Sequence, residues 1–257
     1  MTERHFCLDD SPWFRMVELD EVASTNDFLR CYRPVGEERR MTLVTAEFQT
    51  TGRGSGSNHW ESRRGENLLF SLLIHPRHIP ADRMFVLSEM LALAVRDALS
   101  SFLSPIANQP LKIKWPNDIY WGDKKVCGML IENELRGSVV ENCVMGVGIN
   151  VNQTQFESDA PNPVSLKQIV GEDVERRFVL ERVVEYFCRY YEAESGDVHE
   201  KYLGHLYRRG EVHAFRDKEG DFQGTIVDVE PTGNLIILDE TGQNRRYGFK
   251  EVEYIIN

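Results

Sequence analysis

Closely spaced apolar runs in the middle of the chain constrain its fold most strongly. Residues 111–115, 126–131 and 144–151 are short, apolar and separated by turn residues, which is typical of β-strands. Their connections are too short for parallel crossovers, so these strands are expected to run antiparallel to their neighbours. Further runs at 43–46 and 68–74 extend the predicted sheet.

Two amphipathic helices are predicted, at residues 82–102 and 176–193. In each of them apolar side chains recur every three or four residues and so share one face of the helix. Because strands outnumber helices, the sequence predicts an α+β fold with a mixed sheet and helices packed on one side. The two apolar stripes comprise Met84, Leu87, Leu91, Ala94, Val95, Ala98 and Phe102, and Leu180, Val183, Val184, Phe187 and Tyr191.

The pattern changes from about Gly210 onward. Short β-type runs alternate there with turn signals, which favours a small all-β barrel. A unit of this size is too small to be stable alone, so it is expected to pack on the main domain. We therefore divide the chain into a domain of residues 1–208 and a second unit of residues 209–257. The runs are 212–215, 222–229, 235–238, 247–249 and 252–256.

Composition excludes several classes of protein. The net charge of −11 argues against a general nucleic-acid binder, which usually has a basic face. Five cysteines without a Cys-x-x-Cys pair indicate neither a disulfide framework nor a zinc site, and favour a reducing compartment. No apolar run suits a signal peptide or the ~18 residues of a membrane span. The sequence predicts a cytoplasmic protein without a membrane or nucleic-acid partner.

Two segments carry most of the chemical information. Residues 45–60 form a glycine-rich loop that bears Arg53 and ends in Trp60. Residues 112–132 place Lys114 and Lys125 around a Trp-Pro-Asn-Asp turn that leads into an apolar strand. Glycine lets a backbone approach a ligand closely and lets a loop reorder on binding. Together the segments predict a site that holds an anion and covers it with a mobile loop.

These motifs resemble those of the biotin protein ligases. The resemblance implies a mixed-sheet catalytic domain of the class II synthetase type, flanked by helices and followed by a small C-terminal SH3-like β-barrel. Some members of that family also carry an N-terminal helix-turn-helix and act as repressors; only 23 residues precede Ser24, so no DNA-binding role is expected. The matching motifs, in family order, are Ser24-Thr25-Asn26, Gly52-Arg53-Gly54 with Trp60, Lys114–Asp118, Lys125-Val126-Cys127-Gly128 and Gly146–Asn150.

The activity that the resemblance implies has two steps. The carboxylate of biotin attacks the α-phosphate of ATP, which gives biotinyl-adenylate and pyrophosphate. A lysine of the biotin carboxyl carrier domain of a carboxylase then attacks the mixed anhydride. Such an enzyme needs positioning, cations and exclusion of water rather than a nucleophile of its own. The family includes monomers and homodimers, and both remain open here.

The resemblance also implies roles for individual residues. Lys125 and Arg53 are the catalytic candidates, because the family lysine contacts the reacting carboxylate and α-phosphate and the family arginine lies near the acid group. Asp118 is the candidate ligand of Mg²⁺, which commonly binds one or two carboxylates plus phosphate oxygens. The implied biotin contacts are Ser24, Thr25, Asn26, Gln49, Gly52, Arg53, Lys125 and Gly128; the implied ATP and adenylate contacts are Arg53, Gly54, Ser55, Asn58, Trp60, Lys114, Asn117 and Asn150.

Other interpretations of the same residues stay open at this point. Lys125 could be a solvated lysine of a hairpin turn, and Trp60 an ordinary core residue. Cys127 could be a small apolar side chain of a buried strand or the nucleophile of an octanoyl or lipoyl transferase on a related fold. A lipoate-activating enzyme and a non-catalytic biotin-binding protein are the alternative functions. ATP dependence and acyl preference would distinguish these candidates.

The glycine-rich loop departs from the commonest family pattern. Further cations usually follow the first arginine, whereas this chain has Ser55, Gly56, Ser57 and Asn58. Because fewer cations hold the phosphate less firmly, we predict that more biotinyl-adenylate escapes than from arginine-richer relatives. Measuring the free adenylate released without an acceptor protein tests this; undetectable release would refute it.

Overall fold

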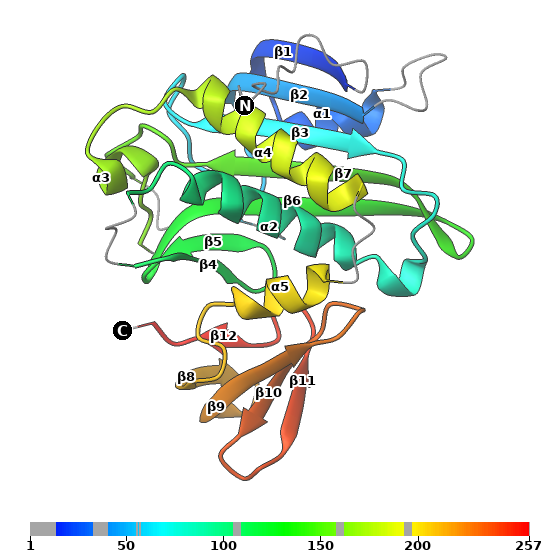
Figure 1. The fold of residues 1–257 in the computed structure, drawn as a ribbon, viewed down its shortest axis with the longest axis vertical. Coiled ribbons are helices and arrows are strands. Elements are labelled where there is room, and N and C mark those ends of the chain that lie inside the picture. Colours follow the sequence, from blue (N-terminus) through cyan, green and yellow to red (C-terminus); the bar gives the residue numbers. More distant parts are fainter. Residues whose placement is uncertain are drawn as a thin grey trace, which may run out of the picture.

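The computed structural model describes residues 14–32, 41–54, 56, 58–104, 109–157, 162–192 and 197–256. Among the predicted site residues, Ser55 lies outside these ranges. The described chain forms a large mixed sheet, helices on both of its faces and a smaller antiparallel sheet beside it (Figure 1). None of its helices is long and apolar enough to cross a membrane.

The large sheet has seven strands in the order β1-β2-β3-β7-β6-β5-β4. Only β1 and β2 pair in parallel, and every other neighbouring pair is antiparallel, as the short connections predicted. The strands are β1 (Phe14–Val22), β2 (Met41–Gln49), β3 (Leu68–Ile74), β4 (Leu111–Lys114), β5 (Asp118–Trp121), β6 (Lys124–Arg136) and β7 (Val139–Ile149).

Two strands of this sheet were not predicted from the sequence. Strand β1 is the edge of the sheet, and most of its side chains are at least partly exposed. Its sequence is therefore rich in charge and lacks a continuous apolar run. Strand β5 spans only four residues between two turns, too few for a periodic pattern to be recognised.

The two predicted helices are confirmed, and both pack on one face of the sheet. They are α2 (Val86–Ser100) and α4 (Arg176–Glu192), which lie side by side across the strands (Figure 1). The expectation that helices cover one side only is wrong, because α1 (Thr25–Cys31) packs on the other face. Side chains alternate along a strand, so Leu72 joins the main core while Leu73 packs beside Leu29 of α1.

Shorter helices complete the large domain. They are a 3₁₀ turn η1 (Ala81–Arg83), α3 (Leu166–Val170) and α5 (Val198–Gly204). Helix α5 leads into the second sheet and packs on α2.

The C-terminal sheet has five antiparallel strands in the order β11-β10-β9-β8-β12. The predicted β runs all fall in or beside these strands, but closure into a barrel is not confirmed, since β11 and β12 stand at opposite edges. The strands are β8 (Val212–Asp217), β9 (Gly220–Val229), β10 (Leu235–Asp239), β11 (Asn244–Tyr247) and β12 (Glu253–Tyr254).

The C-terminal sheet packs on the main domain, as its small size led us to expect. Its apolar side chains belong to the same buried cluster as those of the large sheet. Trp115 Nε1 donates a hydrogen bond of 3.0 Å to the carbonyl of Gly233, in the turn between β9 and β10. This contact joins the second sheet to the Trp-Pro-Asn-Asp turn.

A polar bridge also connects the two parts. His199 of α5 lies with Nδ1 2.7 Å from Glu89 Oε1 of α2 and with Nε2 3.5 Å from Asp228 Oδ1 of β9. Burial raises the pKa of Glu89. Burial alone would lower the pKa of His199, but the hydrogen bonds and charges of Glu89 and Asp228 raise it above the ordinary value. Both shifts favour the protonated forms.

This bridge predicts a stability that depends on pH. A raised histidine pKa contributes stability below the unfolded value of 6.5 that is lost as pH rises through the folded value. The raised pKa of Glu89 acts in the same direction, because its buried charge is penalised as pH rises. We expect the Tm of the wild type to fall between about pH 6 and about pH 8, and the fall to be smaller in His199→Gln. Equal slopes for the two proteins in thermal unfolding would contradict this.

Candidate functional site

The start of helix α1 is buried and carries polar side chains. Ser24 is the N-cap of this helix, and its Oγ accepts a hydrogen bond of 3.4 Å from the backbone N–H of Asp27. Ser24 thus caps a helix that begins at Thr25. Ser24, Thr25 and Asn26 are each at most 3% exposed, although their side chains are polar.

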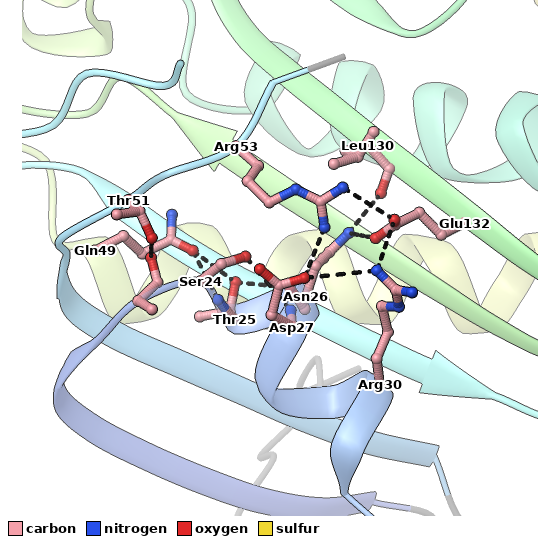
Figure 2. A network of polar contacts seen from close by, with 12 residues as sticks. Ser24, Thr25, Asn26, Asp27, Arg30, Gln49, Thr51, Arg53, Leu130 and Glu132 are labelled. Atoms are coloured by element: carbon pink, nitrogen blue, oxygen red, sulfur yellow. Dashed lines mark hydrogen bonds and ion pairs between the residues drawn. The ribbon is translucent and has the colours of Figure 1, made fainter. Parts of the chain in front are cut away.

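A network of hydrogen bonds satisfies these buried groups (Figure 2). Gln49 Oε1, at the end of β2, accepts from the backbone N–H of Thr25 at 2.8 Å and from its hydroxyl at 3.1 Å. Ser71 Oγ of β3 lies 2.7 Å from Thr25 Oγ1 and 2.6 Å from Asn26 Oδ1. Buried polar groups with all partners in place are held rigidly. Three of the predicted biotin contacts, Thr25, Asn26 and Gln49, are therefore fixed in one connected group.

Glu132 of β6 completes that group. Its Oε2 accepts a hydrogen bond of 2.9 Å from Asn26 Nδ2, which also donates to the carbonyl of Leu130 at 3.2 Å. Neither Glu132 nor Ser71 was identified from the sequence. Ser71 lies within a predicted strand, Glu132 directly follows one, and neither belongs to the matched motifs, so their contribution depends on the tertiary fold.

Arg53 connects the glycine-rich loop to the same group of polar residues. Its guanidinium forms ion pairs with Asp27 Oδ1 at 2.6 Å and with Glu132 Oε1 at 3.3 Å (Figure 2). Arg30 lies 3.7 and 3.6 Å from the same two oxygens. Partial burial lowers the pKa of Arg53, but the two carboxylates outweigh this and raise it. Arg53 thus holds the loop against α1 and β6.

Backbone hydrogen bonds close the base of the loop. The N–H of Trp60 donates to the carbonyl of Gly52 at 2.9 Å, and the N–H of Gly54 donates to the carbonyl of Asn58 at 2.7 Å. The two limbs therefore run side by side and direct Trp60 back towards the sheet. Of the predicted nucleotide contacts in this loop, the structure places Arg53, Gly54, Asn58 and Trp60 together.

A cross-strand pair of glycines receives the indole of Trp60. Gly128 of β6 lies opposite Gly148 of β7. A Cβ atom on Gly148 would collide with Trp60 Cε2, and one on Gly128 would lie 2.9 Å from Trp60 Cζ3 and 3.0 Å from Lys125 Nζ. Trp60 and Lys125 therefore approach the backbone of Gly128 closely. Trp60 Nε1 is buried without a hydrogen-bond partner among the described residues, and the residue as a whole is only partly buried.

Lys125 stands beside this glycine pair. Its Nζ lies 2.7 Å from Asp118 Oδ2 and 5.8 Å from the centre of the Trp60 ring. The side chains of Lys125 and Asp118 are only 27% and 21% exposed, so both are partly withdrawn from water. Lys125 is thus a partly buried, ion-paired residue of β6 rather than a solvated lysine of a turn.

Lys114, the last residue of β4, lies near two tyrosine rings. Its Nζ is 5.4 Å from the ring centre of Tyr120 and 4.7 Å from that of Tyr254. Burial lowers its pKa; the carboxylate of Asp118 opposes this shift, and the charge of Lys125 adds to it. The predicted cations Lys114 and Lys125 therefore both interact with the charge of Asp118.

The two predicted asparagines serve the backbone of β6. Asn117 Nδ2 donates to the carbonyl of Met129 at 2.7 Å. Asn150 is 3% exposed, and its Nδ2 donates to the carbonyls of Lys125 at 3.4 Å and Val164 at 3.3 Å. Both side chains fix the strand that carries Lys125 and Gly128.

Cys127 faces away from the site. Alternation along β6 directs its side chain into the apolar core, where it is fully buried. That burial raises the pKa of the thiol well above its usual value. Because the thiolate is the nucleophilic form, Cys127 is unsuited to acyl transfer. The interpretation of Cys127 as a buried apolar side chain is the one that the structure supports.

Comparison with known proteins agrees with the motifs. Residues 19–150 match the model of the biotin/lipoate A/B protein ligase family. The chain belongs to this family. A solved biotin protein ligase from Aquifex aeolicus, in complex with biotin and ATP, superposes with a TM-score of 0.75 at 28% identity over 93% of this chain and 99% of that one.

Curated relatives of this family member are ligases. The bifunctional ligase/repressor BirA of Bacillus subtilis is 31% identical over 80% of this chain. The match covers 64% of the length of that relative, so this chain spans less than two thirds of it. The biotin–[acetyl-CoA-carboxylase] ligase of Paracoccus denitrificans is 28% identical, and the match covers 78% of this chain and 85% of the relative.

The contact between Trp60 and the glycine pair yields a testable expectation. Gly148→Ala introduces a methyl group where the indole lies, so Trp60 must move. We expect a loss of ~1–3 kcal/mol in the free energy of unfolding, the usual range for overpacking, together with a changed tryptophan fluorescence. Gly204→Ala is the matched control, because a Cβ there meets nothing within 4 Å. Indistinguishable unfolding curves and spectra for the two variants would refute the contact.

Proposed function

We propose that the chain is an ATP-dependent biotin protein ligase. It would join the carboxylate of biotin to the α-phosphate of ATP with release of pyrophosphate. It would then transfer the biotinyl group to a lysine of the biotin carboxyl carrier domain of a biotin-dependent carboxylase. The observation that carries the proposal is the placement of Lys125 beside the glycine pair. The relatives named above, which include a ligase bound to biotin and ATP, support it.

The buried polar group at the start of α1 suits the ureido ring of biotin. A polar ring that enters a protein needs partners for its donors and acceptors. Thr25 and Gln49 are already held in place by mutual hydrogen bonds, so they would bind without reorganisation. The remaining residues proposed on the biotin side are Ser24, Asn26, Gly52, Arg53, Lys125 and Gly128.

Lys125 is the proposed stabiliser of charge at the α-phosphate. In the present structure its ammonium is paired with Asp118 at 2.7 Å. An incoming phosphate would compete for that ammonium, and an ammonium acts well as a point charge beside a phosphate oxygen. The remaining residues proposed on the nucleotide side are Arg53, Gly54, Ser55, Asn58, Trp60, Lys114, Asn117 and Asn150, with the two asparagines acting through the backbone of β6.

Asp118 fits the role of a ligand for Mg²⁺ bound together with ATP. No cluster of three or more candidate metal ligands occurs among the residues that the structure describes. A magnesium ion carried by a nucleotide needs only one or two carboxylates, since water and phosphate oxygens fill its other positions. Asp118 would hold such an ion, which would neutralise phosphate charge.

The C-terminal sheet is the proposed counterpart of the SH3-like unit of this family. We place its boundary near residue 208. Its antiparallel strands and its packing on Trp115 support this assignment.

The adenylation step is tested by ATP–pyrophosphate exchange with biotin, lipoate or octanoate supplied in parallel. We expect exchange with biotin, and a loss of ~10²–10³ in its rate for Lys125→Ala, the scale for removing one electrostatic stabiliser. Lys124→Ala is the matched control, since Lys124 is adjacent but exposed. Wild-type turnover in Lys125→Ala would remove the role of Lys125. Exchange with lipoate instead of biotin would move the chain to the lipoate branch of the family.

A further inference from the structure

A tight turn of the C-terminal sheet extends to the glycine-rich loop. The turn spans residues 248–251 and is closed by a hydrogen bond of 3.2 Å from the N–H of Glu251 to the carbonyl of Gly248. Glu251 Oε2 also accepts from the N–H of Gly248 at 2.6 Å. Lys250 is the third residue of this turn and has a φ of 66°. Glycine usually holds such a position, because a side chain strains the left-handed backbone.

The side chain of Lys250 points at the tip of the loop. A Cβ atom added to Gly56 would collide with Lys250 Nζ and would lie 3.4 Å from its Cε. Lys250 Nζ is also 5.9 Å from the ring centre of Phe249, and that ring lies 6.2 Å from the ring of Trp115. The ammonium of Lys250 therefore lies near Phe249, which in turn packs on Trp115, where the C-terminal sheet meets the large sheet.

The loop tip has no charged residue of its own. Residues 54–58 read Gly-Ser-Gly-Ser-Asn, and Arg53, which precedes them, is paired with Asp27 and Glu132. Lys250, far along the chain, thus brings a cation to a loop segment whose own sequence, residues 54–58, carries none.

We propose that Lys250 completes the nucleotide side of the site. Its ammonium contacts the polyphosphate of ATP and lies against the loop at Gly56. This inference rests on the proposed ligase function. An ammonium on a flexible stem suits phosphate binding, and Gly56 lets the backbone of the loop lie against it. The backbone strain at Lys250 is then tolerated because the side chain at that position is needed.

The position of Lys250 in the turn allows a variant that removes the cation without disturbing the fold. Lys250→Gly suits a positive φ and should leave the Tm unchanged or higher. We expect its KM for ATP in pyrophosphate exchange to rise about tenfold, the size of effect for one charged phosphate contact. The KM for biotin should change less than about twofold on the same reasoning, and Lys250→Arg should restore most of the ATP affinity. Free adenylate released without acceptor should increase in Lys250→Gly.

Lys218→Ala is the matched control, because Lys218 is an exposed lysine in another turn of the same sheet. Unchanged KM for ATP and unchanged calorimetric affinity for inorganic pyrophosphate in Lys250→Gly would overturn the proposal. A parallel rise in both KM values with a lowered Tm would also overturn it, since it would indicate a structural role. If the wild type binds ATP more tightly than Lys250→Gly yet shows no biotin-dependent exchange, Lys250 is supported and the ligase function fails.

Discussion

The close approach permitted by Gly128 and Gly148 is the constraint on which the site depends. These glycines lie opposite each other on the two central strands β6 and β7 and leave part of the sheet without side chains. The indole of Trp60 and the stem of Lys125 occupy the space. A methyl group at either glycine would meet one of them, so the loop and Lys125 can converge only while both positions lack a side chain. Strong β pairing around the glycines offsets their low strand propensity.

Carboxylates organise the charges around that surface. Glu132 binds Asn26 and Arg53, and Asp27 binds Arg53 as well. The residues proposed to bind biotin and the loop proposed to cover it are therefore tied to the same strand. Asp118 pairs with Lys125, and its charge also acts on Lys114. Local acids thus fix the cations of the proposed site, although the protein as a whole has a net charge of −11.

Local signals predicted the central strands and the two long helices, because each depends on neighbours in the sequence. The edge strand β1 was missed because half-exposed side chains do not produce an apolar run. Ser71 and Glu132 were missed for a different reason, since their partners on α1 are brought near only by the folded sheet. The contact of Lys250 with the loop joins opposite ends of the chain and leaves no local pattern at all. The predicted barrel assumed a closure that strand number and turn spacing do not determine.

The account is tested most directly by the complete reaction with a purified biotin carboxyl carrier domain. The carrier would be incubated with this protein, ATP, Mg²⁺ and biotin, and its intact mass measured. The account predicts one biotinyl group on one lysine of the carrier, and none when ATP or biotin is withheld. A carrier that stays unmodified under complete conditions, or one that accepts a lipoyl group in preference to biotin, would contradict it.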